Sequence, residues 1–205
     1  GIVNYSLITP PDIQIYDIDG GYSSVSKEGF TNPNPIAMAM LNEILLDRQK
    51  LNGSVFADVN FLKNLVWHAE LGWDLSWSKG STYEPKVDLG TWVRDNNNSR
   101  IQKNSSTYWT VKNYLTWNEQ FGKHGVTAML GQECWESKWD HVSVYNTGLP
   151  SDVVHNPALG SGKAQIGSGF GSSAMASFFT RETYNYDDRY LATYTFRYDG
   201  SSNFG

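Results

Sequence analysis

The feature that most constrains the fold is a strict alternation of apolar and polar side chains between Leu65 and Ser78. One parity holds only apolar residues, namely Leu65, Trp67, Ala69, Leu71, Trp73, Leu75 and Trp77. Successive side chains of a strand point to opposite faces, so this pattern predicts a β-strand with one apolar and one polar face. The segment is longer than the roughly 9–11 residues with which a tilted strand crosses the hydrocarbon of a bilayer.

The same alternation returns near the carboxyl end and predicts a β-hairpin over residues 174–199. Phe178, Tyr190, Tyr194 and Phe196 share one parity, and the opposite parity is polar. The predicted turn between the two arms is Asp187–Asp188. A soluble sheet would bury so aromatic a face under a second layer. A membrane barrel would turn it to lipid, with tyrosines at the water interface.

Six strands of this kind are predicted, joined by connections that alternate between short and long. The short ones are 62–64, 122–125 and 187–188. Short turns at one rim and long loops at the other are typical of an outer-membrane barrel. We therefore expect an all-β fold of about six antiparallel transmembrane strands, divided into an external loop over 1–50, a hairpin over 51–78, an external loop over 79–105, a hairpin over 106–137, an external loop over 138–173 and a hairpin over 174–199.

The composition excludes several other classes of protein. The 205 residues carry a formal net charge of −5, whereas binding to nucleic acid favours a basic surface. No run approaches the 18 apolar residues of a membrane-spanning helix. The single cysteine, Cys134, excludes a disulfide framework within the chain.

Four polar residues interrupt the apolar parity, namely Asn113, Glu119, Gln132 and Glu182. Glu119 lies near a predicted short turn, where a membrane interface would accommodate it. Glu182 lies inside a strand, so we expect a β-bulge or a shift of parity there.

The polar residues do not form a catalytic constellation, and we expect no catalytic residue, cofactor or metal. His68 and Glu70 share a strand face, as metal ligands can, but a polar position in a barrel lumen is the favoured interpretation. The stretch Gly167–Gly171 resembles a phosphate-binding loop only superficially, because no Lys-Ser or Lys-Thr pair follows it. We interpret it as a flexible loop.

Two sets of residues are candidates for a binding role. Charged and polar side chains of the polar parity would line a lumen or contact a plug domain, and they are His68, Glu70, Asp74, Lys112, Glu133, Arg181, Arg197 and Asp199. Aromatic residues near the long loops would stack on sugars or pack on peptide side chains, and they are Trp92, Tyr108, Trp135, Trp139 and Tyr145.

The stretch RETYNYDDRYLATYTFRYDGSSNFG, from Arg181 to Gly205, resembles a segment of the SusC/RagA-type TonB-dependent outer-membrane transporters. Weaker similarity follows the same order upstream, at 34–37, 115–118, 130–133 and 136–137. The resemblance thus covers about residues 32–205, with its most specific part at the carboxyl end.

The resemblance implies an internal part of a barrel of about 22 strands, with the plug and N-terminal domains absent from this chain. It also implies residence in the outer membrane of a Gram-negative bacterium, in contact with its lipid. The implied activity is import of large nutrients, either oligosaccharide or peptide. The implied partners are a SusD-like surface lipoprotein and the TonB complex, which acts through the plug and N-terminus.

A soluble all-β carbohydrate-binding module is the alternative. The eight Trp and twelve Tyr would suit sugar-binding platforms. Against this alternative, the tryptophans follow one continuous apolar face and do not gather in a single concave patch.

Overall fold

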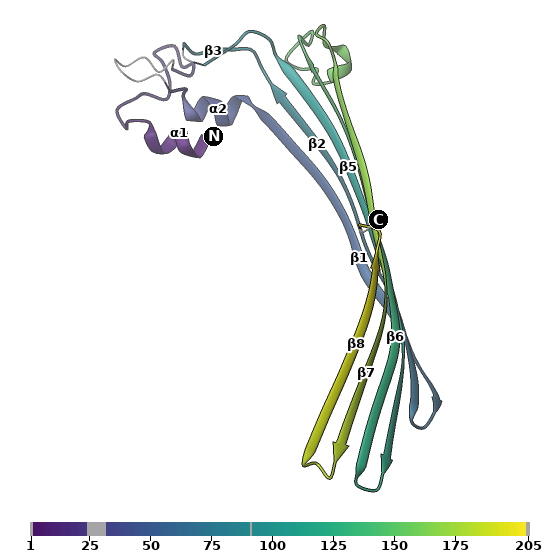
Figure 1. The fold of residues 1–205 in the computed structure, drawn as a ribbon. Coiled ribbons are helices and arrows are strands. Elements are labelled where there is room, and N and C mark those ends of the chain that lie inside the picture. The colour runs from purple at the N-terminus through teal and green to yellow at the C-terminus, as the bar shows by residue number, and fades with distance from the viewer. Residues whose placement is uncertain (1, 24–31, 91, 204–205) are drawn as a thin grey trace. The chain divides into compact units, whose positions relative to one another are not determined.

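A computed structural model describes residues 2–23, 32–90 and 92–203, and it confirms the all-β fold. The six long strands are β1 (Glu43–Leu62), β2 (Leu65–Glu84), β5 (Asn98–Phe121), β6 (His124–Thr147), β7 (Gln165–Tyr186) and β8 (Tyr190–Ser201). They form one sheet in the order β1-β2-β5-β6-β7-β8, so each lies beside its nearest long neighbour in the sequence (Figure 1). The sheet is an up-and-down meander of three tight hairpins joined by longer segments.

The remaining elements are short. β3 (Val87–Asp88) and β4 (Val93–Arg94) form a two-stranded sheet, and α1 (Ile2–Ile8), α2 (Pro35–Leu41) and the 3-10 helix η1 (Pro157–Leu159) are the helices. Proline suits the first turn of α2, because the missing N–H has no partner there in any case. The Asn34 side chain caps the helix by accepting from the backbone N–H groups of Ile36 and Ala37. No described helix is long and apolar enough to cross a bilayer.

The strands extend well beyond the predicted bounds. β1 begins at Glu43 instead of Leu51, and β2 continues to Glu84 instead of Ser78. β7 includes Gly167–Gly171, so the prediction of a flexible loop there was wrong. Alternation marks a strand only where apolar and polar residues separate onto its two faces, and these extensions lack that separation. Glu43–Lys50 has apolar residues on both faces, and Gln165–Ser173 has glycine at every second position between 167 and 171. Part of the predicted loop over 1–50, residues 24–31, lies outside the described residues.

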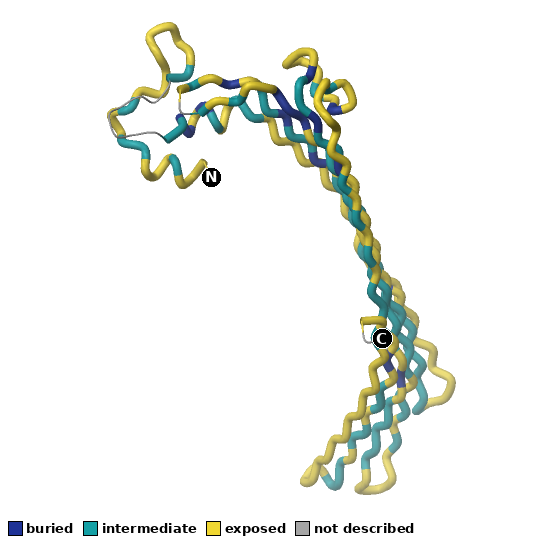
Figure 2. Tube along the Cα trace, turned by 45° about the horizontal axis from the view of Figure 1, so that its top comes forward, coloured by how far each residue is buried: buried dark blue, intermediate teal, exposed yellow. Residues whose placement is uncertain are grey.

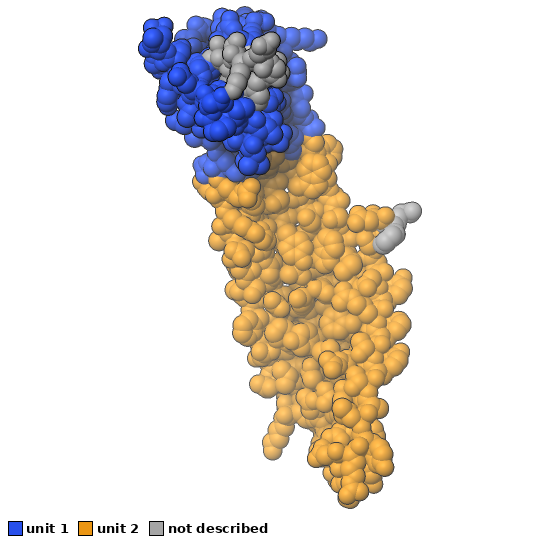
Figure 3. Space-filling view, turned by 90° about the vertical axis from the view of Figure 1, so that its left-hand side faces the viewer, with its two compact units in different colours: residues 1–47, 78–103, 141–168 blue, residues 48–77, 104–140, 169–205 orange. Residues whose placement is uncertain are grey.

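The chain divides into two compact units (Figure 3). Each long strand except β8 contributes residues to both units, and β8 belongs to unit 2 alone. Unit 1 comprises residues 1–47, 78–103 and 141–168. Unit 2 comprises residues 48–77, 104–140 and 169–205. Unit 2 holds the three tight turns and most of the two-faced alternation.

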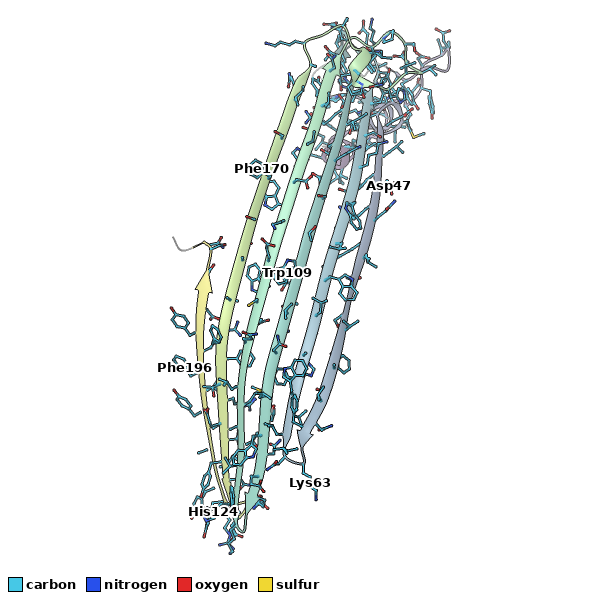
Figure 4. All side chains as sticks on the ribbon, turned by 90° about the vertical axis from the view of Figure 1, so that its right-hand side faces the viewer. Asp47, Lys63, Trp109, His124, Phe170 and Phe196 are labelled. Carbon is cyan, nitrogen blue, oxygen red and sulfur yellow. The ribbon has the colours of Figure 1, made fainter. Side chains whose placement is uncertain are left out.

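Hydrogen bonds join neighbouring tight turns in unit 2. The Asp187 N–H donates to the Lys123 carbonyl at 2.8 Å, and the Lys123 ammonium lies 3.0 Å from the Asp187 carboxylate. Lys63 and His124 accordingly lie at the same end of unit 2 (Figure 4). Asp187 and Asp188 adopt φ values of 51° and 52°, a left-handed conformation that aspartate tolerates. The turn continues through Arg189, one residue further than predicted, before Tyr186 pairs with Tyr190.

One face of unit 2, which we call the apolar face, agrees with the predicted parity. Trp67, Leu115, Leu130 and Phe178, from four different strands, line one shallow groove. On the last hairpin Phe178 pairs with Tyr198. Most residues of the sheet are exposed or half-buried (Figure 2), and among the described residues no second layer covers the apolar face.

The polar interruptions of the apolar face lie in regular strands, and two of them have local hydrogen-bond partners, although the second carboxylate oxygen of Glu182 is buried without a partner among the described residues. Glu182 pairs regularly with Tyr194, so the bulge prediction was wrong. One Glu182 carboxylate oxygen accepts from the Thr180 hydroxyl. Glu119 accepts from the Asn64 side chain beside a tight turn, and Asn113 and Gln132 border the apolar groove.

A polar cluster in unit 1, the Asp152 cluster, joins the exposed Asp152 to the buried side chains of Asn97 and Tyr83. Asn97 is 2% exposed and donates to the Asp152 carboxylate at 3.1 Å. Its side chain also exchanges two hydrogen bonds with the backbone of Leu149, and the Tyr83 hydroxyl donates to Asp152. These bonds tie the connection after β6 to the end of β2 and the start of β5.

Hydrogen bonds from Tyr83 and Asn97 lower the pKa of Asp152, because they stabilise the carboxylate. A lowered pKa contributes stability at pH values above the unfolded pKa of about 3.9, and that contribution disappears as the pH falls through the folded pKa. The connection over 148–164 should therefore stay protected from pH 8 to pH 5 and loosen only in strong acid.

Substituting Asp152→Ala should raise amide hydrogen exchange over 148–164 about threefold to fivefold, since solvent screening at the exposed Asp152 limits the contribution of its hydrogen bonds to about 1 kcal/mol or less. Hydrogen–deuterium exchange with mass spectrometry measures this directly. The exposed Asp95→Ala is the control and should exchange like the parent. Equal exchange in both variants would contradict a latching role for Asp152.

A charged side chain should lower the amount of folded protein when it lies on the apolar face, but have little effect on the polar face. Leu130→Arg places a guanidinium on the apolar face and should cost about 2–4 kcal/mol in a bilayer, whereas Thr127→Arg on the same strand places it on the polar face. We expect the first variant to lower the amount of folded protein in the membrane and the second to change it little, as measured by heat-modifiable migration on gels. Similar losses in both would contradict the assigned faces.

Candidate functional site

A cluster of charges, the Arg197 cluster, lies on the polar face of unit 2. The Arg197 guanidinium lies 2.7 Å from the Asp199 carboxylate and 3.1 Å from that of Glu133, and it donates to the Ser177 hydroxyl at 2.9 Å. Lys112 lies 3.8 Å from the other oxygen of Glu133. Four strands contribute to the cluster, because β6 lies between β5 and β7, and β8 follows β7. Opposite charges compensate each other, so the cluster fixes the positions of its own side chains.

Ring contacts continue this cluster across the sheet. His68 of β2 lies 2.7 Å from the Asp58 carboxylate of β1 and stacks on Tyr114 of β5, with 4.5 Å between ring centroids. Phe179 of β7 lies 6.0 Å beneath the Arg197 guanidinium.

Gly131 of β6 closes the gap between the two sets of rings. A Cβ atom at this position would lie 2.4 Å from Phe179 and 2.7 Å from Tyr114, so only glycine fits without displacing them. Glycine thus lets Tyr114 and Phe179 approach each other across β6. The result is an unbroken row of contacts from Asp58 on β1 to Arg197 on β8.

The other predicted polar residues fall around this row. Asp74 lies 2.9 Å from the Lys50 ammonium. Glu70 and Arg181 form no ion pair with any described residue. Four of the eight predicted residues thus meet in one cluster, while His68 and Asp74 pair with residues that the sequence did not single out. A lumen-lining role for the set stays a prediction.

The five aromatic candidates divide between the units. In unit 1, Trp92 lies 5.4 Å from the Arg94 guanidinium and Tyr145 lies 5.2 Å from that of Arg100. In unit 2 the remaining three lie on the polar face, where the Tyr108 and Trp135 rings are 6.0 Å apart. These three are Tyr108, Trp135 and Trp139.

A hollow of 450 Å³ opens on the same face, beside Tyr108. Its side-chain donors and acceptors come from three strands and are Asn52, Ser54, Asp74, Tyr108 and Thr110. The buried Thr110 hydroxyl has no hydrogen-bond partner among the described residues. Gly72 forms part of the floor, and a Cβ there would lie 2.9 Å from Thr110.

Sequence reasoning missed the glycines that shape this face. Gly167, Gly169 and Gly171 occupy every second position of β7, which indicates a strand with one bare face. That signal was present in the sequence but was interpreted as flexibility. Asp58 and Phe179 gave no separate signal, because their importance depends on the register between strands.

The arrangement of the polar face is suited to binding. Among the described residues, no three His, Cys, Asp or Glu side chains gather as metal ligands would. The polar face instead offers compensated charges, hydroxyls and aromatic rings. These groups recognise ligands without reacting with them.

Three relatives match nearly the whole chain, all TonB-dependent receptors of Formosa agariphila. Receptor P3 is 27% identical over 95% of this chain, receptor P26 is 26% identical over 100%, and receptor P39 is 25% identical over 95%. This chain spans only about a fifth of their length, between 19% and 21%. All three relatives are named receptors and not enzymes. No protein-family model matches the chain.

Solved structures with a similar fold come from the RagAB transporter. The RagAB peptide transporter superposes with a TM-score of 0.83 over 93% of this chain and 22% of the matched chain, at 22% sequence identity. The RagAB importer in its open-open and closed-closed states matches equally well. The chain is thus similar in sequence to a segment of three TonB-dependent receptors and shares the fold of a segment of the RagAB transporter.

Proposed function

We propose that this chain forms part of the barrel wall of an outer-membrane transporter that imports large nutrients, oligosaccharide or peptide, into a Gram-negative bacterium. The observation that carries the proposal is the two-faced sheet of unit 2. Its apolar face remains uncovered, with Tyr190 70% and Tyr194 61% exposed. A bilayer is the environment that makes such a face favourable, and tyrosines suit its interfaces.

In this function the polar face lines the interior. The Arg197 cluster and the row from Asp58 to Arg197 would form the wall against which a plug domain or cargo lies. Glu70 and Arg181, which form no ion pair with any described residue, are the charges most available to a molecule inside the barrel.

The proposed partners follow from the likeness to RagAB and to TonB-dependent receptors. A TonB complex would supply energy through a plug and an N-terminal region, and a SusD-like surface lipoprotein would close over the external loops. RagAB is described as a peptide transporter, which supports import as the activity. The segments 1–50, 79–105 and 138–173 would contribute to the external surface that meets cargo and lipoprotein.

A soluble carbohydrate-binding module has less support. Such a module would bury its aromatic face beneath a second sheet. The described residues contain only one other sheet, the two-stranded pair of β3 and β4 in unit 1.

The proposal predicts opposite sides of the membrane for the long and short connections. Val153 is 88% exposed in a long connection, and the Lys123 side chain is 63% exposed in a tight turn. In a Cys134→Ser background, Val153→Cys should react with a membrane-impermeant maleimide on intact cells. Lys123→Cys should react only after the outer membrane is opened.

Each variant serves as the control for the other, since both sites are exposed within the protein itself. The measurement is the labelled fraction of the full-length protein that carries this chain, before and after opening the membrane. Labelling of Lys123→Cys on intact cells, or protection of Val153→Cys, would overturn the proposed topology.

A further inference from the structure

Trp139 of β6 lies flat across two glycines of β7. A Cβ atom at Gly171 would lie 2.7 Å from the indole Nε1 and 2.9 Å from Cε2. A Cβ at Gly169 would lie 3.3 Å from Cζ3 and 3.5 Å from Cη2. The five-membered ring therefore covers Gly171 and the six-membered ring reaches Gly169. A side chain at 171 would push the indole away from the strand.

The Trp139 indole packs against β7 but remains accessible to a ligand. One face rests on the β7 backbone, while the residue as a whole is 51% exposed. Ser137 and Ser173 share this polar face, because each lies two positions from Trp139 or Gly171 on its own strand. A large flat ring is thus presented among neutral hydroxyl groups. Because packing on the glycines already restricts the indole, little side-chain entropy remains to be lost when a ligand binds.

This combination matches the chemistry of a sugar ring better than that of a peptide. The C–H face of a pyranose is flat and apolar and packs on an aromatic face, while its hydroxyls point sideways toward polar neighbours. A peptide is often bound by the free main-chain groups of a sheet edge. β6 has no such edge here, because it lies between β5 and β7.

A second pair of aromatic rings lies on the same face. Trp135 lies four residues before Trp139, roughly 14 Å along the strand, and contacts Tyr108. Tyr108 borders the hollow that holds Asn52, Ser54 and the unpartnered Thr110 hydroxyl. Aromatic faces and neutral hydrogen-bonding groups therefore follow one another along the wall. A ligand with several sugar rings would meet both.

We propose that Trp139, supported by Gly169 and Gly171, is a stacking platform for a pyranose ring of a neutral oligosaccharide cargo. The inference rests on the proposed transport function and specifies the class of cargo. The hollow beside Tyr108 receives the hydroxyl groups of a ring several units further along the same cargo.

The test uses the full-length protein that carries this chain, purified in detergent. Its ligands are a panel of neutral oligosaccharides, namely fragments of α-glucan, β-glucan, mannan and galactan, and a tryptic peptide pool of similar mass. Titration calorimetry and mass spectrometry of retained ligand measure binding. We expect an oligosaccharide to be retained, and Trp139→Ala to weaken its affinity at least tenfold, since stacking on an aromatic ring contributes about 1–3 kcal/mol.

Three further variants separate the platform from general damage. Trp139→Phe keeps a flat ring and should lose less affinity than Trp139→Ala. Gly171→Ala adds only a Cβ beneath the indole and should weaken binding while the yield of folded barrel stays the same. Trp109→Ala removes a tryptophan of the apolar face, 36% exposed, and should leave the affinity unchanged.

Unchanged affinity in Trp139→Ala, an equal loss in Trp109→Ala, or no binding of any oligosaccharide would overturn the proposal. Retention of peptides alone would do the same while leaving the transport function intact. Failure of the transport function itself would show separately, as the wrong sidedness of Val153→Cys and Lys123→Cys labelling.

Discussion

The proposed place of this sheet in a membrane wall depends on one rule: backbone N–H and C=O groups inside a bilayer must pair with one another, because no water is present to replace them. An antiparallel meander meets this rule with little chain, since each tight turn returns the strand directly alongside its neighbour. The bonds between Lys123 and Asp187 show that even adjacent turns are paired. With the backbone satisfied in this way, the two faces of the sheet are free to differ completely in chemistry.

The chemical difference between the two faces explains which parts of the strands could be predicted from the sequence. Where one face is apolar and the other polar, as from Leu65 to Ser78, the strand is visible as alternation. Where apolar and polar residues do not separate onto opposite faces, as from Glu43 to Lys50 or from Gln165 to Ser173, the strand continues but the alternation is lost. The strands were therefore predicted too short, although the number of long strands was correct.

The candidate site shows a second limit of prediction from sequence, which concerns contacts between strands. Parity places Glu133 and Arg197 on one face, but they are far apart in the sequence and meet only through the register of β6, β7 and β8. The need for glycine at 131 and 171 likewise follows from rings on neighbouring strands. Parity in the sequence thus predicted the face on which a residue lies, whereas its contact partners follow only from the register of neighbouring strands. The glycines at 167, 169 and 171 are an exception, because their spacing alone indicates a strand with one bare face.

The central claim is that one face of unit 2 meets lipid and the other meets water. The most direct measurement is a spin-label scan of residues 126 to 133 on β6 in the full-length protein, in a Cys134→Ser background within lipid nanodiscs. Accessibility to oxygen should peak at the even positions and accessibility to a water-soluble nickel complex at the odd ones, with a period of two residues. An absence of alternation, or maxima with the opposite phase, would contradict the account.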